Sequence, residues 1–497
     1  MIKYTSTRQL SFEEFKTPFY HGLDKTNRWV VLAQHIPWDE FARIYASAMR
    51  DDFGRPALDA RIVIGALIIK HTKGLSDGNT IEEIRENPYL QYFIGYEEFS
   101  HKPPFDPSLF VHLRERIGVD AFEKLNEAFL KKVDIVTDTD KSAPGDTEKD
   151  DNDSTGGGGG NKRQGTLILD ATVAPQDIKY PTDLDLLNEG REQTERLIDE
   201  LWQAGPGKRK PRTYRRTARK DYLAVAKKKR MSKKVLRSAL RKQLNYIKRN
   251  IKTIMKMIEP ELGKPVPLNR KDLRVFWIVQ EVYRQQKQMY DSRMRSVSDR
   301  IVSITQPYVR PIVRGKSGKQ TEFGAKLSVS LVDGYVYLDH LDWNAFNESK
   351  DLKPQVEKYK DRFGCYPAKV IGDKIYRTRK NRRYLKEHQI KLSGRPLGRP
   401  PKLTAKEARL LRQCERLDES LRVQIEGKFG EGKRKYGLDC VMTKTQLTSG
   451  SWIAAVFYIM NIARWLRTCS FLSLLRCLDF FKERIPYSPK MGWAVGY

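Results

Sequence analysis

The hydrophobic residues of this chain follow a helical period in its first part. Residues 62–69 (IVIGALII) form an apolar run, residues 75–78 (LSDG) have the composition of a turn with a helix cap, and residues 105–117 combine a capped start with a basic end. Several short helices joined by capped turns are typical of a helix-turn-helix bundle. An all-helical structural domain fits the same periodicity, so the pattern alone leaves both interpretations open.

A different composition follows at residues 134–164. This stretch is acidic, rich in Gly and Ser, and almost without apolar residues. It cannot bury enough surface to offset the entropy lost on folding, so it is predicted to be a flexible linker. It marks the clearest domain boundary in the sequence.

After this linker the hydrophobic pattern alternates between the period of two typical of strands and the helical period. Residues 165–175 form a short apolar run that predicts a buried strand, and residues 323–331 and 335–338 alternate on either side of Gly334 as a hairpin does. Further strands are predicted at 369–372 and 389–392, with helices at 352–363, at 379–387 and from 406 to about 426. This order of elements predicts a mixed α/β sheet with helices on its faces.

A long helical insertion, at about 188–306, separates the first strand from the hairpin. Apolar residues such as Leu236, Leu240 and Leu244 recur at helical spacing, while the outward positions are strongly basic. Charge runs are usually solvated faces, but so one-sided a bias favours a surface that contacts phosphates.

Overall charge narrows the class of partner. The 497 residues include 93 Lys and Arg against 62 Asp and Glu, a formal net charge of +31, which attracts polyanions and chiefly nucleic acid. An acidic membrane would require a basic helix with a bulky apolar face, which the basic segments lack. The N-terminus has no signal-peptide pattern and no apolar run approaches ~20 residues, so a soluble intracellular protein is predicted. Five cysteines without a CxxC pair predict free thiols and disfavour a zinc site.

Three carboxylates are candidates for catalysis. Asp170 ends the apolar run LILD and Asp373 ends KVIGD, although aspartate is disfavoured in strands and is costly beside a buried strand unless it is paired or bound to a metal. Glu426 borders the apolar stripe (Leu417, Leu421, Ile425, Phe429) of the helix that starts at 406. Singly, each acid is better explained as a turn former or a surface residue. Together, in so basic a chain, they favour a site for two Mg²⁺ ions in phosphoryl transfer.

Three segments resemble the catalytic blocks of DDE-type insertion-sequence transposases. They are LDATVAP, VIGDKIYRTRKNRRYLKEHQI and RVQIEGKFGEGKRKYGL, and they occur in the family's order. The similarity is to the bacterial branch that carries a Tyr–Arg–Glu–Lys signature around its last acid. Residues 55–96 also resemble the helical DNA-binding domain found at the start of many members. Only the linker and parts of the basic insertion lie outside the resemblance.

The resemblance implies an α/β fold with an RNase H-like mixed sheet flanked by helices. It implies that Asp170, Asp373 and Glu426 are the catalytic, metal-binding triad. The implied cofactor is Mg²⁺, bound as two ions for which Mn²⁺ can substitute. Asp333, Asp339, Asp342 and Glu431 are competing acids, but the triad is preferred because each of its three members matches its block.

The signature also implies contacts to DNA phosphates near the cut. Arg422 and Lys433 match its arginine and lysine, whereas the position expected to be tyrosine is Glu419. Three glycines after Glu426 leave open whether the helix reaches Lys433 or whether this lysine lies on a loop.

The reaction implied is DNA transposition. A metal-activated water cuts a phosphodiester at the element's end, and the freed 3′-hydroxyl attacks target DNA, so no Ser, Tyr or Cys nucleophile is needed. The partners implied are double-stranded DNA, as terminal inverted repeats and target, and a second copy of the chain. The location implied is the nucleoid in the cytoplasm of a prokaryotic cell, without a membrane partner. A non-catalytic DNA-binding regulator and a nuclease without strand transfer are the alternatives.

These inferences predict four parts in the chain. Residues 1–133 form a helical DNA-binding or dimerisation domain, and 134–164 form the linker. Residues 165–445 form the catalytic domain, which the insertion at about 188–306 interrupts. Residues 446–497 form a helical tail, whose aromatic-rich stretch at 451–466 is expected to pack against the catalytic domain.

Overall fold

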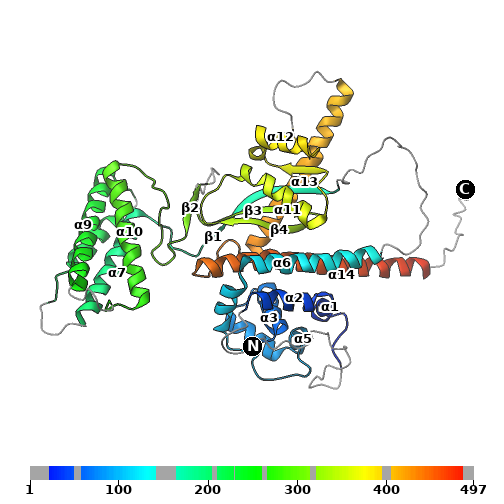
Figure 1. Ribbon diagram of the computed structural model, residues 1–497, viewed down its shortest axis with the longest axis horizontal. Coiled ribbons are helices and arrows are strands. Elements are labelled where there is room, and N and C mark those ends of the chain that lie inside the picture. Colours follow the sequence, from blue (N-terminus) through cyan, green and yellow to red (C-terminus); the bar gives the residue numbers. More distant parts are fainter. Residues whose placement is uncertain are drawn as a thin grey trace, which may run out of the picture.

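The computed structural model describes residues 22–49, 57–140, 164–203, 210–228, 230–259, 266–313, 321–394 and 404–484. A mixed sheet lies between two helical units, an N-terminal group of helices and a separate bundle on the left of Figure 1. The N-terminal helices are α1 (Arg28–His35), α2 (Trp38–Ser47), α3 (Ala60–Lys73), α4 (Asp77–Glu86), α5 (Pro88–Phe93) and α6 (Leu109–Asp140).

The remaining helices belong to the bundle, to the faces of the sheet and to the C-terminal part. They are α7 (Asp183–Gln203), α8 (Arg215–Ala226), α9 (Lys233–Ile258), α10 (Arg270–Ser292), α11 (Leu352–Phe363), α12 (Arg379–Glu387), α13 (Ala405–Lys435) and α14 (Gln446–Arg484). None of those in the described part of the chain has a stretch that is both apolar and long enough to span a bilayer.

The sheet has six strands and both senses of pairing. Its strands are β1 (Thr166–Pro175), β2 (Arg310–Val313), β3 (Thr321–Val332), β4 (Tyr335–Asp342), β5 (Lys369–Gly372) and β6 (Lys391–Leu392). The long strand β3 is antiparallel to β1 on one side and to β2 and β4 on the other, while β1, β5 and β6 are parallel. The predicted mixed α/β sheet is therefore confirmed, with β2 as a short strand that the hydrophobic pattern did not indicate.

The N-terminal helices form as their caps predict. The Ser76 side chain accepts a hydrogen bond from the Asn79 backbone and starts α4 within the expected turn. Helix α6 continues through Asp140, into the range expected to be linker, and is kinked at Gly118, where φ is 70°. Residues 141–163, the rest of the predicted linker, lie outside the described part.

Helix α14 joins the N-terminal helices to the sheet. It lies alongside α6 (Figure 1) and also packs against β4 and α3. Its buried Asn461 donates to the Asn126 side chain of α6 at 2.9 Å and to the Val336 carbonyl of β4 at 2.7 Å. The tail thus packs against the sheet as expected, and it packs against the N-terminal helices as well.

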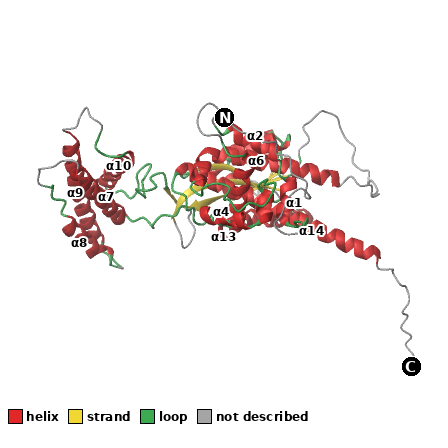
Figure 2. Ribbon diagram, turned by 90° about the horizontal axis from the view of Figure 1, so that it is seen from below, coloured by secondary structure: helices red, strands yellow, loops and turns green. Residues whose placement is uncertain are grey.

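The insertion is an independent bundle of α7 to α10. Leu187 (α7), Ile247 (α9) and Val279 (α10) are fully buried in its core. The bundle begins at Asp183, slightly before the predicted boundary at 188. Figure 2 shows it set apart from the other helices and connected to the sheet by loops.

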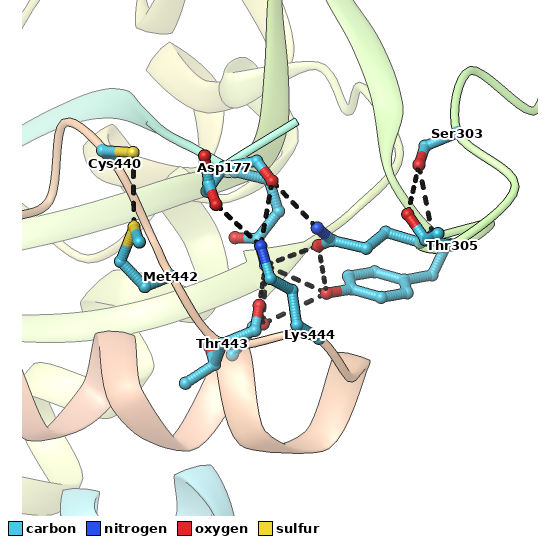
Figure 3. A network of polar contacts seen from close by, with 11 residues as sticks. Asp177, Ser303, Thr305, Cys440, Met442, Thr443 and Lys444 are labelled. Atoms are coloured by element: carbon cyan, nitrogen blue, oxygen red, sulfur yellow. Dashed lines mark hydrogen bonds and ion pairs between the residues drawn. The ribbon is translucent and has the colours of Figure 1, made fainter. Parts of the chain in front are cut away.

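Polar contacts fix these connections where the bundle meets the sheet. The buried Gln176 amide, just after β1, lies within hydrogen-bond distance of Gln306, Tyr308, the Thr443 carbonyl and Ser449. Beside it Lys444 pairs with Asp177 at 2.7 Å, and Thr305 and Ser303 lie on the second connection (Figure 3). Both connections are therefore held to the segment that leads into α14.

Replacing Gln176 with leucine should lower the free energy of unfolding by about 1–3 kcal/mol, because it removes the amide at the centre of a buried polar network, whose other members keep only their bonds to one another. Chemical denaturation measures this loss. The exposed Gln288 of α10 gives a matched control, since Gln288→Leu removes no buried hydrogen bond and should change stability by less than about 0.5 kcal/mol. Equal effects of the two substitutions would show that the Gln176 network does not hold the bundle.

Candidate active site

Asp170 lies in the interior of the sheet. The apolar run LILD ends at this residue, but strand β1 continues past it to Pro175, in agreement with the strand predicted at 165–175. The strand can continue because the following residues, ATVAP, are apolar and pair with β3. The Asp170 carboxylate is partly buried and accepts a hydrogen bond from the Ala171 backbone at 2.8 Å.

Asp373 follows directly after β5, as expected. In the parallel pairing of β1 and β5, Leu169 lies opposite Gly372, so Asp170 and Asp373 come next in the register of these neighbouring strands. Asp373 caps a short 3₁₀ turn, Lys374–Tyr376, and its exposed side chain accepts from the Lys374 backbone at 2.6 Å. The sheet thus brings the first two predicted acids to the same place.

The third acid lies on α13. This helix packs against β1 and β5 through Ile425 and Phe429, which are buried. Leu417, expected in the same apolar stripe, is instead 64% exposed, because the first half of the helix extends beyond the sheet. Glu426 is half exposed and accepts a hydrogen bond from Arg422 at 2.8 Å.

The two basic residues of the signature share the face of Glu426. Helix α13 runs to Lys435, so Lys433 is helical and not on a loop. Residues 422, 426 and 433 fall on one side of a helix of 3.6 residues per turn. All three line the same cavity as Asp170 and Asp373, which has a volume of about 620 Å³. Glu419, at the position expected to be tyrosine, does not line it.

Sequence reasoning missed one acid of this cavity. Glu348 lies on a 3₁₀ turn, Glu348–Lys350, after β4, and it forms a 2.9 Å ion pair with Lys326 of β3. The turn has no periodic pattern, and no spacing in the sequence relates Glu348 to the other acids. The alternation of inward and outward side chains along β3 could have predicted the face on which Lys326 lies, but it could not have predicted that Glu348 is its partner.

The competing acids have other roles. Asp339 is buried in an ion pair with Arg362 at 2.7 Å, and Glu431 pairs with Lys428 at 3.1 Å and with Arg467 at 2.9 Å. Asp333 lies at the turn between β3 and β4, and Asp342 caps the turn after β4. None of these four lines the cavity.

The N-terminal histidines and the described cysteines do not line this cavity. Burial lowers the pKa of His71 to about 3, so this histidine of α3 is a neutral core residue, whereas His101 and His112 are exposed. Four of the five cysteines lie in the described part as free thiols, and Cys477 lies outside the described side chains.

The cavity disfavours the ionised form of Asp170. Burial, together with repulsion from Glu348 and Glu426, raises the pKa of Asp170 to about 6, although the Ala171 hydrogen bond and Arg422 act in the other direction. Asp170 is thus more acidic unfolded than folded, and its ionisation opposes folding once the pH exceeds the unfolded pKa near 3.8.

An Asp170→Asn variant should therefore be more stable than the unaltered protein when no metal is present, by about 1–3 kcal/mol at about pH 8. The difference should shrink as the pH falls to about 5, since the folded carboxyl is then largely protonated. Denaturant unfolding in chelator at both pH values measures it. A gain that does not depend on pH would show that the charge of Asp170 is not its source.

The donor set fits hard divalent cations. Asp170, Asp373 and Glu426 offer only oxygen, which Mg²⁺ and Mn²⁺ prefer, and the raised pKa of Asp170 marks a place where a cation would relieve repulsion. Within the described residues the acids share the cavity but are not gathered into a cluster of three or more close enough to hold an ion. Arg422 meanwhile offsets the charge of Glu426.

Comparisons with known proteins match two parts of the chain. Residues 370–463, which include Asp373 and Glu426, match the family described as "Transposase DDE domain". Residues 18–116 match "Transposase domain (DUF772)". A relative from Rhizobium meliloti, "Uncharacterized protein ORF8 in nfe locus", is 34% identical over 154 residues, which are 31% of this chain and 64% of the relative. No solved structure matches the chain. The two matches, to separate parts of the chain, together indicate a DDE-type insertion-sequence transposase.

Proposed function

We propose that this chain cuts DNA at the ends of its own element in a metal-dependent reaction and transfers the freed 3′ ends into target DNA. The observation that carries the proposal is the convergence of Asp170, Asp373 and Glu426 on one cavity. Strands β4, β3 and β1 run antiparallel, and β5 and β6 follow parallel to β1. An RNase H-like sheet, which we also propose, accounts for this order.

The three acids would hold two Mg²⁺ ions, which Mn²⁺ could replace. Bound there, the ions would activate the attacking oxygen and stabilise the leaving one. Asp170, fixed on a central strand, sets the position of the site, while Asp373 and Glu426 approach from β5 and α13. Strands of the sheet hold the first two acids more rigidly than loops would.

Arg422 and Lys433 would hold the DNA backbone beside the acids. They lie one turn before and two turns after Glu426 on the same side of α13. A guanidinium suits bidentate contact with phosphate, and a lysine suits a single charge contact. We propose that Arg422 exchanges its ion pair with Glu426 for a phosphate when DNA and metal enter.

The division of the chain and its assembly are proposed on the same basis. Residues 165–445 form the catalytic domain, with the bundle as its insertion, and residues 1–133 with the tail support it through α6 and α14. Two DNA ends must be joined to one target, so we propose a homodimer in the DNA complex. The mass of that complex in solution, with two end duplexes, tests this arrangement.

One assay separates the proposal from its alternatives. Purified protein is mixed with Mg²⁺, labelled DNA carrying the element's ends, and a target plasmid. Joined products support a transposase, cut but unjoined DNA supports a nuclease, and bound but intact DNA supports a non-catalytic regulator. We expect joined products that require the divalent ion.

A further inference from the structure

Helix α9 carries a straight row of cations along its outer face. Lys234, Arg241 and Lys248 are separated by two helical turns each, and Lys252 and Lys256 continue the same face one turn at a time. All five are exposed. We call these five residues the α9 stripe.

The opposite face of α9 is used by the bundle. Leu244, Ile247 and Ile254 are buried against α7 and α10. Val235 and Met255 are the exposed large apolar residues of α9 in the described chain, which is less than the broad apolar face that a membrane-binding amphipathic helix requires. The face of α9 that carries the stripe is exposed to solvent.

Ion pairs with the described residues do not neutralise the stripe. No carboxylate of the described residues forms an ion pair with any of its five members, whereas the neighbouring Lys242 pairs with Asp221 and Arg215 pairs with Asp199. Asp221 is the only acidic residue between positions 208 and 258. A solvated helix face normally mixes both signs, so a row of one sign favours a polyanionic partner over a merely solvated surface.

The length and the place of the stripe suit a DNA duplex. From Lys234 to Lys256 the helix rises about 33 Å at 1.5 Å per residue, close to the ~34 Å of one turn of B-DNA. Figure 1 shows α9 on the side of the bundle away from the sheet. DNA lying there would contact the bundle outside the active-site cavity.

The N-terminal helices are poorly suited to supply the main electrostatic attraction. Acidic and basic residues nearly balance across positions 1–133. Helix α4, which follows the turn of the expected helix-turn-helix, reads DGNTIEEIRE and has four acids with one arginine. Such a helix repels phosphates over its exposed face.

We propose that the α9 stripe is the principal non-specific DNA-binding surface of the chain and clamps one turn of the duplex backbone outside the active site. This rests on the proposed function only in taking DNA as the substrate. Because phosphate contacts carry no sequence information, the stripe supplies affinity and orientation. Recognition of the DNA sequence must come from other residues that contact the bases.

The test measures the salt dependence of binding of the full-length protein to a duplex of arbitrary sequence, without divalent metal. Five glutamines in place of the stripe should make the slope of log K against log salt shallower by about 4.5, at roughly 0.9 for each of five lost phosphate contacts. Circular dichroism and thermal unfolding verify folding. A variant with arginine at the four lysines should keep the original slope.

The matched control replaces five exposed cations of the N-terminal part, Arg43, Lys102, Arg116, Lys124 and Lys131, with glutamine. Its slope should change by less than about one. The proposal is overturned if the control loses the slope and the stripe variant keeps it, or if both change alike. Because no cleavage is scored, failure of the proposed chemistry would leave this result unaffected.

Discussion

An Asp373→Asn variant is expected to bind the element's ends as tightly as the unaltered protein and to cut them at least about a hundred-fold more slowly. Asparagine keeps the shape and can still accept the Lys374 hydrogen bond that caps the turn, but it removes the charge needed by a divalent ion. Binding is measured by electrophoretic shift and cleavage by the rate of appearance of labelled product in Mg²⁺.

Asp333→Asn is the matched control for this experiment. Asp333 lies in the same sheet but at the turn between β3 and β4, with φ of 49°, a conformation that asparagine tolerates. It is outside the cavity, so cleavage should be unchanged. If Asp373→Asn cuts as fast as Asp333→Asn, then Asp373 is not a metal ligand and the proposed active site is wrong.

The largest loss of stability is expected for Arg362→Met. The guanidinium of this α11 residue lies between Asp339 at 2.7 Å and Glu127 of α6 at 2.9 Å, and the Asp339 side chain is only 1% exposed. Removing the guanidinium leaves the buried Asp339 carboxylate without a cation, with the Gln355 amide still donating to it, and the loss of a buried ion-pair partner costs about 3–5 kcal/mol. Denaturant unfolding should show this loss, together with earlier release of α6 in hydrogen exchange.

Lys353→Met provides the comparison within the same helix. Lys353 is exposed and only lies over the ring of Tyr384, so its loss should cost less than about 1 kcal/mol. Similar values for the two variants would mean that Arg362 behaves as a surface residue and does not join the N-terminal helices to the sheet.

The strands and helices around the site could be predicted because their periods are unambiguous. Helices 352–363 and 379–387 and the strand 369–372 have the predicted bounds. Helix α13 was predicted to end near Glu426, because three glycines follow and weaken a helix. It continues to Lys435 since Gly432 lies against Leu438 and Met460, where a Cβ would not fit. A packing contact of this kind overrides local propensity and cannot be read from spacing.

Two further features of the site could not be predicted from the sequence, because they also depend on tertiary contacts. Strand β2 (Arg310–Val313) is four residues long and contains proline, so it has no period and forms only because β3 extends far enough to pair with it. Glu348 enters the cavity through its ion pair with Lys326. The predicted acids were found because strand β5 ends in one of them and β1 contains another, which is a local signal.

The central claim, that the cavity formed by β1, β5 and α13 is the metal-dependent active site, can be tested without knowing the DNA ends. Fe²⁺ is bound in place of Mg²⁺, ascorbate and peroxide generate hydroxyl radicals at the ion, and the cut positions in the polypeptide are mapped by mass spectrometry. Cuts near residues 170, 373 and 426 that excess Mg²⁺ suppresses are the predicted result. Mg²⁺-sensitive cuts confined to other segments would contradict the claim.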